Sequence, residues 1–117
     1  MSYNVIDVVE FGKSLEKIAR KYLSSLDLVD ELFVELEKGR FSGDRVPGLK
    51  LKGNLVYKTR LKNPDANKGE SEGFRVIWYL VTSENEIYPL TIYSKSTQTD
   101  ITSKEITKMK KKYLGRV

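Results

Sequence analysis

The chain has 117 residues, of which 39% are hydrophobic and 32% are charged, a composition typical of one globular domain spanning residues 1–117. It contains neither cysteine nor histidine, which excludes disulfides, Cys/His zinc sites, cysteine nucleophiles and histidine bases. The first ten residues lack the basic start and apolar run of a signal peptide, and the apolar run at 76–81 is too short to span a bilayer. We therefore expect a cytoplasmic protein without membrane contact.

Positive charge is concentrated in two parts of the chain. Residues 40–62 contain seven Lys or Arg and one Asp, and residues 100–117 contain six Lys or Arg and two acids. Such clusters are typical of surfaces that bind a phosphate backbone or an acidic protein, although a solvated basic surface gives the same pattern.

The order of elements begins with a β-branched stretch at 3–9 that predicts a short strand. Apolar residues at helical spacing then predict an amphipathic helix over 11–22 and a second over 27–38, with Gly39 as its stop. The short break between them indicates a helical hairpin. Glycines and a proline make 40–53 a predicted loop.

Three strands and a helix complete the prediction. The strands cover 54–61, 73–82 and 86–95, with a polar loop at 62–72 and a short turn at 83–85. Pro89 indicates an edge or a bulge, and a Thr-x-x-Glu capping box at Thr102 opens the last helix. The expected fold is α+β, in the order β-α-α-β-β-β-α, with the hairpin packed on one face of an antiparallel sheet.

Alternation along the strands places one apolar face under the helices, with Leu55, Tyr57, Phe74, Val76, Trp78, Leu80, Tyr88, Leu90 and Ile92 among its residues. The opposite face collects cations and tyrosines from three strands and none of their acids: Lys58, Arg60, Arg75, Tyr79, Tyr93 and Lys95. An ordinary solvated face would mix in acids and small polar residues. The pattern therefore favours a binding or catalytic face.

This face suits RNA cleavage without a metal or other cofactor. The reaction needs a base for the ribose 2′-OH, cations for the phosphorane and an acid for the 5′ oxygen. Neighbouring cations favour a neutral lysine, so Lys58 is the candidate base. Arg60 and Arg75 are candidate phosphate clamps. Tyr93 is suited to stacking on a base or orienting the 2′-OH, and Lys95 to acting as acid or as a further clamp.

Several segments resemble one protein family: 56–61 (VYKTRL), 68–78 (KGESEGFRVIW), and 90–96 (LTIYSKS) followed by Asp100-Ile101. Together with the hairpin that ends at Gly39, they resemble the RelE/ParE superfamily of bacterial toxins from type II toxin–antitoxin modules, in its RelE-like branch. The resemblance covers roughly residues 5–110 and rests on the order and spacing of the motifs.

The resemblance implies a small fold of two helices on an antiparallel sheet and metal-independent cleavage of mRNA, commonly on the ribosome, with inhibition of translation. It also implies neutralisation by a cognate antitoxin. The family's functional positions fall on Lys58, Arg60, Arg75, Tyr93 and Lys95. Some relatives use a histidine or a late tyrosine near the site. This chain has no histidine and its Tyr113 lies in a different context, so the general acid stays open.

Two other functions fit the same fold. One is a gyrase-poisoning toxin of the ParE branch, which needs no cationic catalytic face. The other is a non-catalytic module that binds RNA or an acidic protein. The basic segment at 100–117 suits an acidic partner or ribosomal RNA, and it equally suits a solvated helix face.

Overall fold

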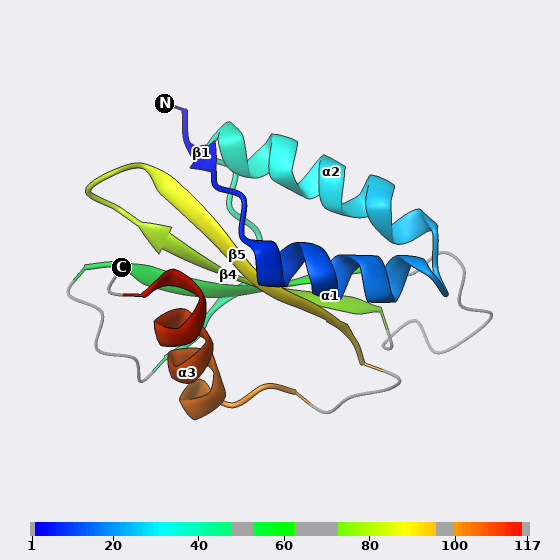
Figure 1. Cartoon of the computed structure of the whole chain (residues 1–117). Helices are drawn as coiled ribbons and strands as arrows, with labels where there is room; N and C mark the ends of the chain where they lie inside the picture. The colour runs from blue at the N-terminus through cyan, green and yellow to red at the C-terminus, as the bar shows by residue number, and fades with distance from the viewer. Residues whose placement is uncertain (1, 48–52, 63–72, 96–99, 116–117) are drawn as a thin grey trace.

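A five-stranded sheet lies between a helical hairpin and a single C-terminal helix in the computed structural model, which describes residues 2–47, 53–62, 73–95 and 100–115 (Figure 1). The strand order is β1-β5-β4-β3-β2, with β1 parallel to β5 and every other pair antiparallel. The elements in chain order are β1 (Asn4–Val5), α1 (Val9–Ala19), α2 (Ser24–Glu37), β2 (Asp44–Arg45), β3 (Leu55–Leu61), β4 (Phe74–Val81), β5 (Glu86–Ser94) and α3 (Ser103–Leu114). The predicted α+β class is confirmed.

The helical hairpin covers one face of the sheet because each helix has one apolar side. Phe11 of α1 and three α2 residues are buried against strand side chains in the larger core: Val29, Leu32 and Leu36. Gly39 ends α2 with a φ of 80°, which favours glycine. The N–H groups of Gly39 and Arg40 donate to carbonyls of the last helical turn, as in a Schellman motif. The predicted helix stop is confirmed.

The middle strands of the sheet have the predicted facing. The rings of Tyr57 and Trp78 stack at 4.4 Å on the hairpin side. The indole Nε1 of Trp78 donates to Thr59 Oγ1 at 2.9 Å, and that hydroxyl donates to the carbonyl of Ser42 at 2.6 Å. These bonds satisfy the polar atoms of two buried side chains and connect β3 and β4 to the chain before β2.

The last strand departs from simple alternation at a bulge. Trp78 pairs with Pro89 whereas Ile77 pairs with Thr91, so β5 has one extra residue there. The predicted irregularity at Pro89 is confirmed. The predicted placement of Tyr88 and Leu90 on the hairpin face is wrong, because the bulge shifts the alternation: Tyr88 pairs with Tyr79, and Leu90 packs in a second core on the other face.

Part of that other face is covered by α3 (Figure 1). The predicted capping box is present, with Thr102 and Glu105 bonded reciprocally. Ile106 is 1% exposed and packs in a second core with residues of three strands: Val56, Ile77, Tyr79, Val81, Leu90 and Tyr93. The sequence pattern gave α3 no position, and the structure shows that it leaves only part of the sheet face open.

The remaining differences lie at the sheet edges. The strand predicted at 3–9 has two residues, since α1 already begins at Val9. The loop predicted over 40–53 contains the short strand β2, which pairs with β3. Most of the predicted loop at 62–72 lies outside the described residues. Among the helices that the structure describes, none has the length and apolar character needed to cross a membrane.

Candidate functional site

The predicted site residues come from three adjacent strands and the chain just after them. Arg60 of β3, Arg75 of β4 and Tyr93 of β5 are direct register neighbours, so their side chains leave the same face of the sheet. Lys58 lies two residues before Arg60 on that face. Lys95 follows β5, and its backbone N–H donates to the carbonyl of Gly73 at 3.2 Å. The structure therefore gathers all five residues on the face away from the hairpin.

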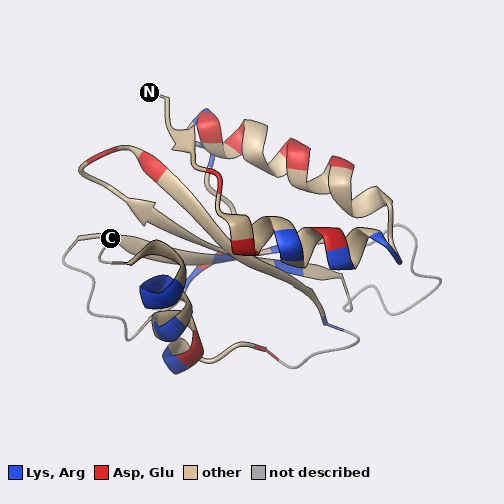
Figure 2. Ribbon diagram, in the orientation of Figure 1, with Lys and Arg blue, Asp and Glu red and all other residues tan. Residues whose placement is uncertain are grey.

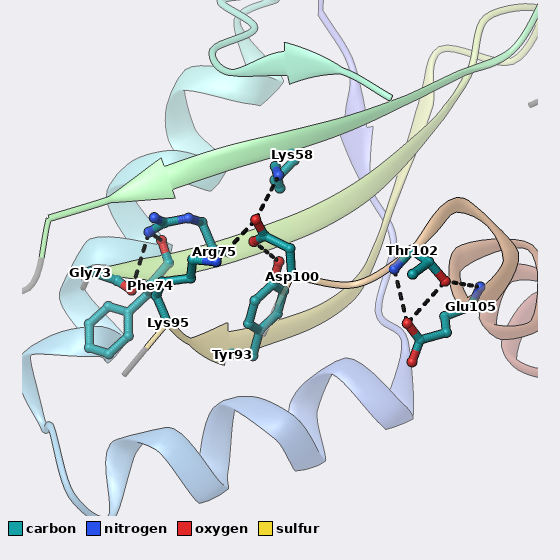
Figure 3. A network of polar contacts seen from close by, with 9 residues as sticks. All are labelled: Lys58, Gly73, Phe74, Arg75, Tyr93, Lys95, Asp100, Thr102 and Glu105. Atoms are coloured by element: carbon teal, nitrogen blue, oxygen red, sulfur yellow. Dashed lines mark hydrogen bonds and ion pairs between the residues drawn. The ribbon is translucent and has the colours of Figure 1, made fainter. Parts of the chain in front are cut away.

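Two of these residues are buried and three reach the surface. Arg75 is 6% exposed and Tyr93 is 3% exposed. Arg75 Nη1 donates to the carbonyl of Gly73 at 3.3 Å, which turns its guanidinium toward the start of β4 (Figure 3). The ring of Tyr93 packs in the second core, so it is not available to stack on a base. Arg60 is exposed, and the lysine side chains are 22% and 32% exposed for Lys58 and Lys95.

A carboxylate that the strand pattern did not include joins these groups. Asp100 Oδ2 lies 3.1 Å from Lys95 Nζ and 3.8 Å from Lys58 Nζ. The hydroxyl of Tyr93 donates to Asp100 Oδ1 at 3.1 Å. Figure 3 shows Asp100 among these three side chains. We call Lys58, Tyr93, Lys95 and Asp100 the Asp100 cluster.

The cluster has a defined charge state near neutral pH. The hydrogen bond from Lys95 is the main cause that lowers the pKa of Asp100, so its carboxylate is ionised. Burial raises the pKa of Tyr93 to about 12, a backbone hydrogen bond with Ile101 opposes this, and the bond to Asp100 raises it further. Tyr93 is therefore a neutral hydrogen-bond donor at neutral pH and does not act as a base.

Two glycines let the chain approach β3 beside the site. A Cβ on Gly43 would collide with the backbone carbonyl of Lys58, and the φ of Gly43 is +101°. A Cβ on Gly73 would collide with the carbonyl of Leu61, at the other end of β3. The close approach of the chain to Lys58, and the backbone two residues before Arg75, thus both require glycine.

The face is not free of acids, contrary to the strand pattern. Asp44 of β2 pairs with Lys58, so both side chains leave the same face. It was missed because β2 has only two residues and lies in a stretch that resembles a loop. Asp100 was missed as a site residue because it follows the last strand, where alternation no longer applies. Its sequence signal was its place beside Ile101 in the segments that resemble RelE-like toxins.

No metal site accompanies the cluster in the part of the chain that the structure describes. No three Asp or Glu side chains converge there as a metal site requires. A cavity of about 380 Å³ lies between α1 and β5, with Lys17, Lys21 and Tyr22 in its wall. Tyr93 also lines this cavity, whereas Lys58 and Lys95 do not. The Asp100 side chain is 45% exposed, so the carboxylate of the cluster lies at the surface.

Charge differs between the two layers that cover the sheet (Figure 2). Within its bounds, α2 carries five acidic residues and no Lys or Arg, whereas α3 carries five lysines and one glutamate. The sheet face with the Asp100 cluster is the one that α3 covers. In α1, the other helix of the hairpin, two lysines balance two glutamates. A polyanion is therefore attracted to the cluster side and repelled by α2.

Comparison with solved structures gives a similarity that spans nearly the whole chain. The chain is similar to a structure described as E. coli toxin RelE in the free state, a mutant with two arginines replaced by alanine, with a TM-score of 0.53 and 17% sequence identity. The match covers 96% of this chain and 98% of that chain. The chain has a RelE-like fold. No family model matches the sequence, and no curated protein matches it. The RelE-like fold accounts for the sheet, the hairpin and the C-terminal helix together.

Proposed function

We propose that this chain is the toxin of a type II toxin–antitoxin system and a metal-independent mRNA endonuclease that acts on ribosome-bound mRNA. One observation supports this proposal most strongly. Two lysine ammonium groups and a tyrosine hydroxyl converge on the carboxylate of Asp100, on the more basic side of the molecule. The RelE-like fold and the motifs that resemble that family support the same assignment. A cognate antitoxin is the expected protein partner, and the expected location is the cytoplasm.

The proposed reaction begins with attack of the ribose 2′ oxygen on the adjacent phosphorus. The bond from the 2′ oxygen to phosphorus forms, and the bond from phosphorus to the 5′ oxygen breaks. The 2′ proton passes to a base, and the 5′ oxygen receives a proton from an acid. Negative charge grows on the non-bridging phosphate oxygens between these steps, so fixed donors stabilise the transition state.

The structure supports different roles for the five predicted residues. Lys58 and Lys95 are surface cations within reach of one bound anion, which suits stabilising the phosphorane. Lys95 remains the candidate proton donor. Lys58 remains the candidate base: in its neutral form it would accept the 2′ proton, and the ammonium that results would then stabilise the phosphorane. The raised pKa of Tyr93 keeps its hydroxyl protonated, so it donates a hydrogen bond. Exposed Arg60 suits binding of a neighbouring phosphate, and Arg75 is assigned a positioning role through the backbone of Gly73.

The proposal is tested by expressing the chain in bacteria and mapping new 5′ ends on mRNA by primer extension. The unmodified protein should arrest growth and generate 5′ ends at codon positions. Lys58→Ala should lose both effects, because removing one donor to a transition-state oxyanion lowers a rate by about 10²–10³-fold. Lys13→Ala, which removes an exposed lysine of α1 on the other side of the sheet, is the matched control and should behave like the unmodified protein.

Lys58→Ala is preferred to Arg75→Ala because Arg75 is buried and its loss can unfold the protein. Folded protein that accumulates without growth arrest would refute the toxin assignment. Growth arrest with intact mRNA and DNA damage would indicate a gyrase-poisoning toxin, and RNA binding without cleavage would indicate a binding module.

A further inference from the structure

The hydrogen-bond donors around Asp100 are of the kinds that bind phosphate groups in proteins. Two ammonium groups meet one oxygen of the carboxylate, and a hydroxyl donates to the other. A phosphodiester likewise has two oxygens on one atom that share a single negative charge, and charge-assisted hydrogen bonds from lysine are typical of phosphate sites. Asp100 comes from the chain between β5 and α3, so it is an additional anion in this arrangement rather than part of the strands that carry the donors.

We propose that Lys58, Lys95 and Tyr93 form the subsite for one RNA phosphate, and that Asp100 occupies this subsite in the free protein and leaves it when RNA binds. The inference rests on the proposed function for the identity of the ligand. It adds a defined phosphate position and a competing group within the same chain.

The position of Asp100 permits it to leave without unpacking the fold. Its side chain is 45% exposed, whereas the following helix is anchored to the second core by buried Ile106. The capping box between Thr102 and Glu105 determines where that helix starts (Figure 3). A phosphate beside an ionised Asp100 would be repelled, because like charges a few ångströms apart near a protein surface interact unfavourably. Displacement removes this repulsion and leaves both lysines paired with an anion.

RNA fits this subsite better than an acidic peptide does. Arg60 lies exposed on the same sheet face, and the lysines of α3 extend the positive charge beyond the cluster. RNA supplies a phosphate at every nucleotide, so a strand that fills the subsite also places charges along these neighbours. The base itself is not held by Tyr93, whose ring is buried.

Binding of a labelled single-stranded RNA with 2′-O-methyl groups tests the inference, since this probe cannot be cleaved by 2′ attack. Asp100→Asn removes the charge and nearly preserves the shape of the side chain. Its Kd, measured by fluorescence anisotropy at one fixed salt concentration, should fall about tenfold if Asp100 fills the subsite in about nine-tenths of free molecules. Asp30→Asn makes the same charge change on exposed α2 and should leave the Kd within about twofold of the unmodified protein.

A Kd for Asp100→Asn that is unchanged or higher overturns the inference. If the unmodified protein still cleaves mRNA, the proposed function survives that result. Failure of both the unmodified protein and Asp100→Asn to bind the probe overturns the inference, and absence of mRNA cleavage by the unmodified protein on ribosomes overturns the proposed function as well. Tighter binding of a poly-glutamate peptide by Asp100→Asn, without tighter RNA binding, overturns the assignment of the ligand as RNA.

A measurement on the unmodified protein applies even if Asp100→Asn does not fold. The side chains of Tyr93 and Asp100 are in contact in the free protein, so NMR should show a nuclear Overhauser effect between the Tyr93 ring protons and the Asp100 β protons. Saturation with the 2′-O-methyl RNA should abolish it. Persistence of this effect at saturation would show that the carboxylate stays in place and would overturn the displacement.

Discussion

Deprotonation of Tyr93 at high pH should measurably lower the unfolding free energy of the protein. Burial, opposed by the Ile101 hydrogen bond and reinforced by Asp100, raises the pKa of Tyr93 to about 12, against about 10 for an unfolded tyrosine. A raised folded pKa contributes stability that is complete below about pH 10 and is lost as the pH rises to about 12. Two pKa units correspond to about 2–3 kcal/mol of unfolding free energy.

Urea unfolding of the unmodified protein and of Tyr93→Phe at several pH values measures this loss. Tyr93→Phe lacks the hydroxyl and cannot lose this proton. Between about pH 10 and pH 12, the unfolding free energy of the unmodified protein should therefore decrease by about 2–3 kcal/mol more than that of Tyr93→Phe. The difference in ultraviolet phenolate absorbance between the unmodified protein and Tyr93→Phe separates the titration of Tyr93 from that of the other six tyrosines and gives its pKa. Asp100→Asn should lower that pKa part of the way toward 10, because burial remains. Titration of Tyr93 near pH 10 in the folded protein would refute the reasoning.

Two further changes test the packing around the site. Thr59→Val keeps the side-chain shape but leaves Trp78 Nε1 and a backbone carbonyl without their partner, so it should lower the unfolding free energy by about 1–3 kcal/mol in urea, whereas Thr59→Ser should retain most of the stability. A loss no larger for Val than for Ser would contradict this. Gly43→Ala places a Cβ against the Lys58 carbonyl, so the backbone at Lys58 must shift. The mRNA cleavage rate should therefore fall even at temperatures below the thermal midpoint, where the variant is still folded. Unchanged cleavage would show that the approach of Gly43 does not position Lys58.

The elements that followed from the sequence are those with a strong local signal. The amphipathic hairpin ends where Gly39 can adopt a positive φ, and the capping box at Thr102 begins α3 as predicted. The facing of β3 and β4 followed from alternation because both are regular strands. In each case neighbouring residues determine the structure, so their pattern is sufficient.

The elements that did not follow depend on distant parts of the chain. The bulge at Pro89 was signalled by the proline, but its effect on the facing of Tyr88 depends on pairing with β4. The short β2 forms only because Gly43 allows close approach to β3. Asp100 lies beyond the end of β5, so no strand periodicity predicts its contacts with Lys58, Tyr93 and Lys95. The five predicted residues share one face, yet the burial of Tyr93 depends on its packing with Ile106 of α3 in the second core.

Chemical analysis of RNA ends tests the central proposal most directly. Purified protein is incubated with ribosomes that carry a defined mRNA, and the cleaved fragments are analysed for their terminal groups. Attack by the 2′ oxygen predicts a 2′,3′-cyclic phosphate on one fragment and a 5′ hydroxyl on the other. These ends should form with the unmodified protein and with Lys13→Ala, and should form about 10²–10³-fold more slowly with Lys58→Ala. Intact mRNA, or equal cleavage by Lys58→Ala, would contradict the proposed site and its chemistry.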